Sequence, residues 1–128
     1  MSTLKEVIKR AIKLCADDVD HEEKGGIILQ DGDSFKFVYL KNTLAGTPQA
    51  MGLWVADMNE FGEKVIPLLT NTCKAYGSFH THPLFLPVPS SIDRMRLFQG
   101  YKYNYIWSVK YKSLCKYAIE NGEWVNVL

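Results

Sequence analysis

The sequence predicts an α+β fold, in which a mixed, largely antiparallel sheet is flanked by helices within a single domain spanning residues 1–128. Stretches with apolar residues at helical spacing are interspersed with short apolar or period-two stretches that are typical of strands. The turn pairs Asp31-Gly32 and Asn121-Gly122 each follow a strand-like stretch and indicate antiparallel hairpins. The helices and strands show no regular βαβ order, which disfavours a parallel sheet. The length is that of one domain with one core.

The first predicted element is an amphipathic helix from Thr3 to about Ala16. Its apolar residues recur at helical spacing, and Thr3 with Glu6 forms a capping-box pattern. Two apolar stretches follow, at residues 25–29 and 35–40, and turn residues separate them. This pattern predicts a β-hairpin, which would be the first pair of strands in the sheet.

The middle of the chain predicts a loop followed by a helix. Residues 41–51 are rich in turn residues and indicate a loop, and residues 53–55 indicate a short strand. A second capping pattern begins at Asp57, and helical periodicity continues to about Leu69. Because Pro67 cannot donate a backbone hydrogen bond, we expect it to kink or shorten the last turn.

The second half of the chain predicts more strands and one short helix. Residues 74–80 indicate a strand that ends at the first of two closely spaced histidines. Residues 90–98 follow as a helix with Ser90 at its N-cap. Aromatic and apolar residues at odd positions of 101–111 predict a long half-buried strand, and residues 117–120 and 124–127 predict the closing hairpin.

Composition and charge limit the classes of function. The formal net charge of +1 gives no general attraction to nucleic acid or to an anionic membrane. The three cysteines are widely spaced and contain no Cys-x-x-Cys pair, so neither a disulfide framework nor a thiolate zinc site is indicated. The sequence shows neither the apolar core of a secretory signal at its start nor an apolar run long enough to span a membrane. We therefore expect a cytoplasmic protein.

A candidate metal site lies between residues 80 and 93. Side chains two apart on a strand point to the same face, so His80 and His82 can present two imidazole nitrogens to one point. Asp93, in the first turn of the next helix, would add an oxygen ligand and leave a fourth tetrahedral position for water, as in catalytic zinc sites. A lone His-x-His pair is more often an ordinary feature of a strand, and a Ser-x-x-Asp pair is more often a helix cap.

The spacing of these residues resembles that of a known family. His80-Thr81-His82-Pro83 followed by Ser90-Ser91-Ile92-Asp93 is similar to the motif of the JAMM metalloproteases, also called MPN-plus domains. The proline before Ser90 resembles the compact microbial members. The family also has an upstream glutamate followed three residues later by a glycine and then by apolar residues, and the stretch from Glu23 to Leu29 is similar to that pattern.

The resemblance implies a fold, a cofactor and a role for each motif residue. The fold would be a curved mixed sheet flanked by helices, similar to that of zinc-dependent deaminases. It implies that His80, His82 and Asp93 bind Zn2+, that Glu23 is the general acid/base, and that Ser90 helps to stabilise the oxyanion. Glu22 is the alternative base, and the spacing to the glycine in the motif favours Glu23.

The predicted function is that of a zinc-dependent amide-bond hydrolase, a peptidase or isopeptidase. Its expected partner is a protein or peptide substrate, such as a conjugate of a ubiquitin-like modifier or a sulfur-carrier protein. One alternative is a non-catalytic MPN-like binding or assembly module. A further alternative is a RadC-like nucleic-acid-associated domain that uses the aromatic and lysine-rich run at residues 101–117. These aromatic residues share one strand face, as a core strand also requires, which favours packing. The sequence leaves the oligomeric state open.

Overall fold

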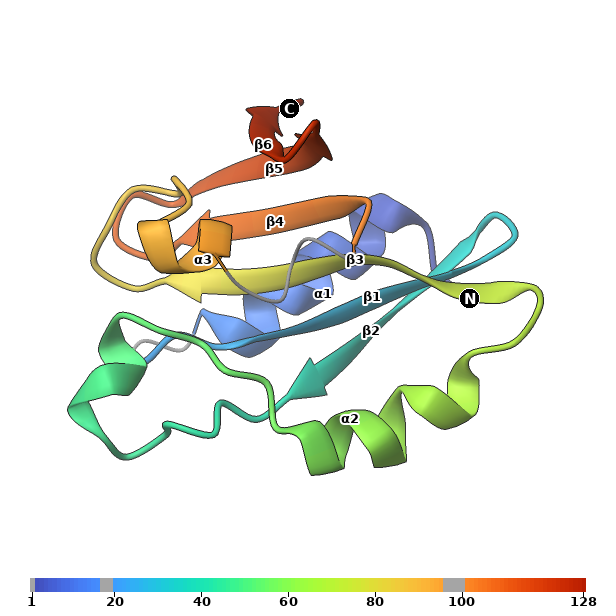
Figure 1. The fold of residues 1–128 in the computed structure, drawn as a ribbon, viewed down its shortest axis with the longest axis horizontal. Helices are drawn as coiled ribbons and strands as arrows, with labels where there is room; N and C mark the ends of the chain where they lie inside the picture. The colour runs from blue at the N-terminus through green and yellow to red at the C-terminus, as the bar shows by residue number, and fades with distance from the viewer. Residues whose placement is uncertain (1, 17–19, 96–100) are drawn as a thin grey trace.

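A computed structural model describes residues 2–16, 20–95 and 101–128 of the chain. Its strands form one sheet in the order β2-β1-β3-β4-β5-β6 (Figure 1). The strands are β1 (Gly25–Asp31), β2 (Ser34–Leu40), β3 (Cys73–His82), β4 (Tyr103–Ser108), β5 (Ser113–Glu120) and β6 (Glu123–Asn126). Among these strands β3 and β4 pair in parallel and all other neighbours pair antiparallel. This arrangement confirms the predicted mixed, largely antiparallel α+β fold.

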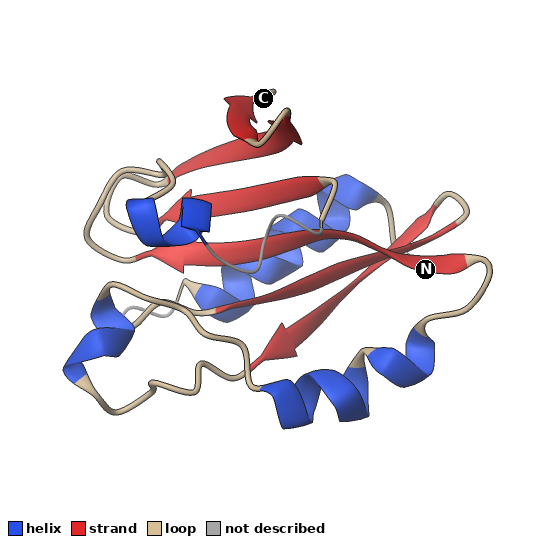
Figure 2. Ribbon diagram, in the orientation of Figure 1, coloured by secondary structure: helices blue, strands red, loops and turns tan. Residues whose placement is uncertain are grey.

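The helices cover both faces of the sheet (Figure 2). They are α1 (Leu4–Cys15), α2 (Met58–Lys64) and α3 (Ser91–Met95), with the 3-10 turns η1 (Pro48–Met51) and η2 (Ile66–Leu68). In Figure 1, α1 lies behind the sheet and α3 lies in front of it. The reciprocal hydrogen bonds between Thr3 and Glu6 confirm the capping box predicted for α1. Among the described residues, no helix combines the length and the apolar character that crossing a membrane requires.

Apolar residues pack against both faces of the sheet. On the α1 side, Val7 and Ala11 contribute to a cluster that includes Phe79 of β3 and Tyr105 of β4. On the other side, apolar residues of β1 and β2 pack with residues of the segments beside them, namely Ile27, Leu29, Val38, Leu40, Trp54 and Val65. Residues 79 and 80 of β3 therefore point to different environments, because neighbouring strand residues face opposite sides.

The predicted strand at residues 53–55 is wrong. The described structure has an isolated bridge between Asn42 and Ala56 in this region, and residues 53–55 form no ladder. The Asn42 side chain donates to the Leu53 carbonyl at 2.9 Å and accepts from the Val55 amide at 3.2 Å. The Asn42 side chain therefore binds backbone groups that a strand neighbour would otherwise have bound.

Two other predicted elements end earlier than the sequence pattern indicates. The helix that begins after Asp57 ends at Lys64 and continues as the turn η2, which contains Pro67. The strand predicted for 101–111 covers only Tyr103–Ser108, because residues 109–112 turn back toward β5, whose Ser113 pairs with Ser108. In this turn the Tyr111 amide donates to Ser108 Oγ at 3.1 Å and Lys112 has a φ of 50°.

The ends of the chain follow the prediction more closely. Asn121 and Gly122 have φ values of 53° and 79°, as the turn of a two-residue hairpin requires, and this turn joins β5 to β6. Helix α3 begins directly after Ser90, as predicted. The remainder of that predicted helix, with Leu97 and Phe98, lies outside the described residues.

Candidate metal centre

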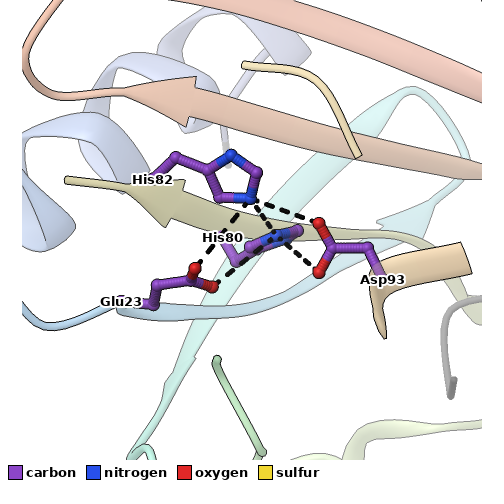
Figure 3. Close-up of side chains that lie close together, drawn as sticks. All are labelled: Glu23, His80, His82 and Asp93. Atoms are coloured by element: carbon purple, nitrogen blue, oxygen red, sulfur yellow. Dashed lines mark hydrogen bonds and ion pairs between the residues drawn. The ribbon is translucent and has the colours of Figure 1, made fainter. Parts of the chain in front are cut away.

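Four side chains with metal-binding atoms meet at the end of β3. Glu23, His80, His82 and Asp93 each offer one ligand atom, and these atoms lie within 4.8 Å of one another. Figure 3 shows that the four side chains point toward one another. All four residues are buried, with exposed fractions of 3%, 0%, 4% and 3%. The structure thus brings together four of the five site residues predicted from the sequence.

The pairing of β1 with β3 brings Glu23 to the histidines. In the antiparallel register, Gly25 lies opposite His80. The pairing continues one residue further, because the Lys24 amide donates to Thr81 Oγ1 at 3.0 Å and the Thr81 amide donates to the Lys24 carbonyl at 2.8 Å. This register places Glu23 next to the end of β3, so residues some sixty positions apart in the sequence become neighbours.

Gly25 allows this close pairing of the strands. A Cβ atom at Gly25 would lie 2.2 Å from the Phe79 carbonyl oxygen and 2.9 Å from the His80 Cβ. Any larger residue would push β1 away from His80, and the carboxylate of Glu23 would move with it. The motif glycine, three residues after Glu23, is Gly26, where a Cβ atom would lie 2.1 Å from the Val38 carbonyl oxygen, so both glycines have a steric role in this chain.

Asp93 is held by a reciprocal helix cap with Ser90. The Asp93 amide donates to Ser90 Oγ at 3.1 Å, and the Ser90 amide donates to Asp93 Oδ2 at 3.0 Å. The cap fixes the carboxylate on the first turn of α3, facing the histidines. In the described residues Ser90 Oγ acts in this cap, and its predicted role at an oxyanion stays a prediction.

The distances within the cluster fit one tetrahedral ion. His80 Nε2 lies 3.3 Å from His82 Nε2, and Asp93 oxygens lie 3.3 Å from His80 Nε2 and 3.2 Å from His82 Nε2. Ligand atoms that surround zinc tetrahedrally at about 2.0–2.1 Å are separated by about 3.3–3.4 Å. These nitrogen and oxygen atoms are therefore spaced as ligands of a common metal ion.

The hydrogen bonds of His82 also fit a metal. Its Nδ1 lies 2.9 Å from the Leu86 carbonyl oxygen, which can only accept, so Nδ1 carries a proton. In the neutral ring Nε2 then has a lone pair that faces the Asp93 carboxylate, and this arrangement needs a cation or a second proton. Burial lowers the pKa of His82, but the hydrogen bond to Asp93 and the charge of Glu23 outweigh it and raise this pKa.

The carboxylate of Glu23 lies farther from the two histidine Nε2 atoms than the carboxylate of Asp93 does. Its carboxylate oxygens are 3.9 Å from His80 Nε2 and 4.0 Å from His82 Nε2. Glu23 Oε1 has no hydrogen-bond partner among the described residues. Burial raises the pKa of Glu23 to about 7, although the nearby histidines oppose the shift. A carboxyl group with this pKa both accepts and releases protons near neutral pH.

Glu22 does not enter the cluster. Its carboxylate accepts a hydrogen bond from the Gly46 amide at 2.7 Å, so it holds the loop that follows β2. Of the two adjacent glutamates, Glu23 is therefore the one that faces the histidines.

Two residues near the cluster were missed by sequence reasoning. The Trp54 ring is parallel to the His80 ring, with an angle of 7° and centroids 6.1 Å apart. Asn42 is 3% exposed, and its Nδ2 donates to the Glu23 carbonyl at 3.0 Å. Both lie in the segment between β2 and α2, where the sequence pattern gave no signal of contact with the site. The stacked Trp54 and the bound Asn42 restrict the positions of His80 and Glu23.

The aromatic and lysine-rich run packs within the protein. Tyr105 is 3% exposed and belongs to the cluster on the α1 side. Lys116 Nζ lies 4.1 Å from the Tyr103 ring centroid and donates to the Tyr76 hydroxyl at 3.0 Å. These contacts favour the packing interpretation of the run over a surface for stacked bases.

Comparisons with known proteins identify the family and support the fold. The family profile described as prokaryotic homologs of the JAB domain matches residues 5–120. A JAB1/MPN domain protein from Archaeoglobus fulgidus has a similar crystal structure, with a TM-score of 0.59 and 17% identity over 98% of this chain and 94% of that one. A search of curated proteins finds no match.

Two solution structures share the fold as well. A protein from Desulfitobacterium hafniense has a TM-score of 0.70 and 21% identity over 98% of this chain and 87% of that one. A protein from Salinibacter ruber has a TM-score of 0.62 and 18% identity over 100% of this chain and 89% of that one. At these identities the structural matches show the fold alone, whereas the family profile spans most of the sequence. The chain belongs to the family of prokaryotic homologs of the JAB domain.

Proposed function

We propose that this protein is a zinc-dependent amide-bond hydrolase of the JAMM type, with His80, His82 and Asp93 as the metal ligands. The donor set supports zinc, because two imidazole nitrogens and one carboxylate leave a tetrahedral position open. The family supports the same metal, because its JAMM members depend on zinc. When bound, zinc lowers the pKa of a coordinated water to about 7 and polarises a carbonyl group.

The position of Glu23 is the observation that carries the proposal. Its buried carboxylate oxygens lie 3.9 and 4.0 Å from the two Nε2 atoms, beyond direct hydrogen-bond distance, whereas the Asp93 oxygens lie at 3.3 and 3.2 Å. With a pKa of about 7, Glu23 takes a proton from the attacking water and donates it to the leaving amine. A residue in this position serves hydrolysis, which metal binding alone would not require.

The substrates that we propose are proteins or peptides, including conjugates of ubiquitin-like modifiers or of sulfur-carrier proteins. The buried cluster lies at one end of the sheet, between the segment before β1 and helix α3 (Figure 3). Ser90 is next to Pro89 at the start of α3, and we propose that it also helps to stabilise the oxyanion.

The test separates metal binding from turnover. Glu23→Gln should keep about one zinc per chain and lose roughly 10²- to 10⁴-fold in turnover of a ubiquitin-like protein joined to lysine, or of a quenched peptide. His80→Ala should lose the zinc itself, as measured by metal analysis of the purified protein. If the wild type holds zinc and Glu23→Gln leaves every measured function intact, the domain is a non-catalytic binding module and the hydrolase proposal is wrong.

A further inference from the structure

An exposed apolar segment joins His82 at the end of β3 to Asp93 on α3. Between His82 and Asp93, five large apolar side chains reach the surface: Leu84 (37%), Phe85 (63%), Leu86 (56%), Val88 (49%) and Ile92 (37%). The sequence from residue 83 to residue 92 contains no charged side chain. Soluble proteins rarely expose apolar side chains in such a concentration unless the surface binds something.

The backbone of this segment is held from within the protein. Three consecutive carbonyl groups accept hydrogen bonds from side chains of different strands. Ser108 Oγ donates to the Phe85 carbonyl at 2.6 Å, His82 Nδ1 donates to the Leu86 carbonyl at 2.9 Å, and the Tyr117 hydroxyl donates to the Pro87 carbonyl at 2.8 Å. The polar groups thus face the protein while the side chains of Phe85 and Leu86 face solvent.

This arrangement is rigid before any ligand binds. Pro83, Pro87 and Pro89 restrict φ, and the Val88 amide donates to the Leu86 carbonyl at 2.8 Å. Ordering a flexible loop would oppose binding, so a loop that is already ordered binds an apolar group more tightly. A segment with no role in binding would not need exposed apolar side chains on a fixed backbone.

The apolar segment is also continuous with the candidate active site. The bond from His82 to the Leu86 carbonyl joins the segment to a proposed ligand whose Nε2 faces Asp93. Ile92 directly precedes Asp93 on α3. A chain that reaches the cluster from this side would therefore pass close to these side chains.

We propose that residues 84–88 and Ile92 form a docking surface for a large apolar side chain, such as Leu or Phe, near the scissile amide of the peptide or protein substrate. The proposal rests on the hydrolase function and defines its substrate class. Recognition is by apolar contact, because the segment offers no charge and its carbonyls at residues 85–87 are already bound. Phe85 and Leu86 are the most exposed of these residues, and they determine the preference for substrates with a large apolar side chain.

Quenched peptides test the proposal. Each decapeptide carries a single Leu or Phe at one position of a Ser/Gly background, and the reference peptide carries none. The wild type should cleave at least one apolar peptide with a kcat/KM about tenfold or more above the reference. In the double variant Phe85→Ser/Leu86→Ser, the ratio of kcat/KM for the apolar peptide to kcat/KM for the reference peptide should fall to about one.

Leu14→Ser is the matched control. Leu14 is 53% exposed but lies on α1, behind the sheet, so this variant should keep the full preference. A wild type without preference for the apolar peptides overturns the proposal, as does a double variant that keeps the preference.

A binding measurement separates this proposal from the hydrolase function. Zinc-loaded Glu23→Gln protein, with and without the double substitution, is titrated with the same peptides under fluorescence anisotropy. If the wild type cleaves no peptide but the double substitution weakens binding of an apolar peptide about tenfold or more, the hydrolase function fails and the docking surface stands. Absent or unchanged binding overturns the docking surface.

The same surface could instead bind a second copy of the chain. Sedimentation of the wild type and of the double variant tests this. A wild-type dimer that becomes monomeric when Phe85 and Leu86 are replaced would overturn the substrate-docking proposal, whereas the same oligomeric state in both proteins supports it.

Discussion

The two faces of β3 are equally buried but are stabilised in different ways. Phe79 on one face and His80 on the other are each 0% exposed. Phe79 packs among apolar side chains under α1, including Phe37 at a ring distance of 5.8 Å. On the opposite face, polar groups are bound by other polar groups, such as Ser78 Oγ, which donates to Asn104 Oδ1 at 2.6 Å.

The two faces of β3 differ in how their stability depends on pH. Apolar packing is insensitive to pH, whereas the cluster contains carboxyl groups whose pKa values differ. Burial raises the pKa of Asp93, but hydrogen bonds from His80 and His82 outweigh it and hold this pKa well below its usual range. Burial instead raises the pKa of Glu23 to about 7. The α1 face therefore contributes stability that does not change with pH. On the other face, the buried carboxyl of Glu23 makes stability depend on pH, as is common for groups at functional sites.

Phe79→Ala should have the largest effect on stability. It opens a cavity in the α1 face and should lower the free energy of unfolding by about 3–5 kcal/mol in urea titrations. Phe85→Ala is the control, because its side chain is 63% exposed and should change stability by less than about 0.5 kcal/mol. Equal losses in the two variants would contradict the assignment of Phe79 to the core.

Glu23→Gln should stabilise the metal-free protein at high pH. Since the pKa of Glu23 is about 7 in the fold and 4.5 in the unfolded chain, the folded protein retains a proton that the unfolded chain releases between these values. The wild type therefore loses stability as the pH rises through this range, and Glu23→Gln does not.

The two proteins should be compared by thermal and urea unfolding in chelator. The variant should be more stable by roughly 3 kcal/mol at pH 8, and the difference should vanish near pH 4. A difference that does not change with pH would mean that the buried carboxyl is not the destabilising group.

Asn42→Ala should weaken the polar face by a smaller amount. It removes the donor to the Glu23 and Leu53 carbonyls and should cost about 1–3 kcal/mol of stability. Because the hydrogen bonds of the Asn42 side chain go to backbone groups, including the Glu23 carbonyl, zinc content should stay near one per chain while turnover falls. If Asn42→Ala lost zinc to the same extent as turnover, Asn42 would not act by positioning Glu23.

Thr3→Ala should have the smallest effect and should be confined to the α1 face. Loss of the cap should cost about 1 kcal/mol, as measured by the shift in the urea midpoint. Zinc content and turnover should stay at wild-type levels, because α1 lies behind the sheet (Figure 1). A fall in turnover would show that the two faces are coupled.

Sequence patterns correctly predicted the elements that are stabilised by interactions between residues close in the sequence. The capping box of α1 and the turn at Asn121-Gly122 involve residues at most three positions apart, and both are present. One prediction failed where a distant group decides the backbone. Residues 53–55 are bound by the side chain of Asn42, more than ten positions away. The strand predicted for 101–111 ends early for a local reason, because residues 109–112 turn back into β5.

Some features of the candidate site also follow from local sequence patterns, and others follow only from the tertiary structure. The sequence by itself determined the residue types and their spacing on β3 and α3, because a strand places His80 and His82 on one face and a helix cap holds Asp93 near Ser90. The motif spacing favoured Glu23 over Glu22 as the base, and in the tertiary structure Glu23 faces the histidines while Glu22 binds the Gly46 amide. The tertiary structure alone placed Trp54 against His80 and turned Phe85 and Leu86 toward solvent. Strand register and contacts between distant segments depend on the packing of the whole chain, which no local sequence pattern encodes.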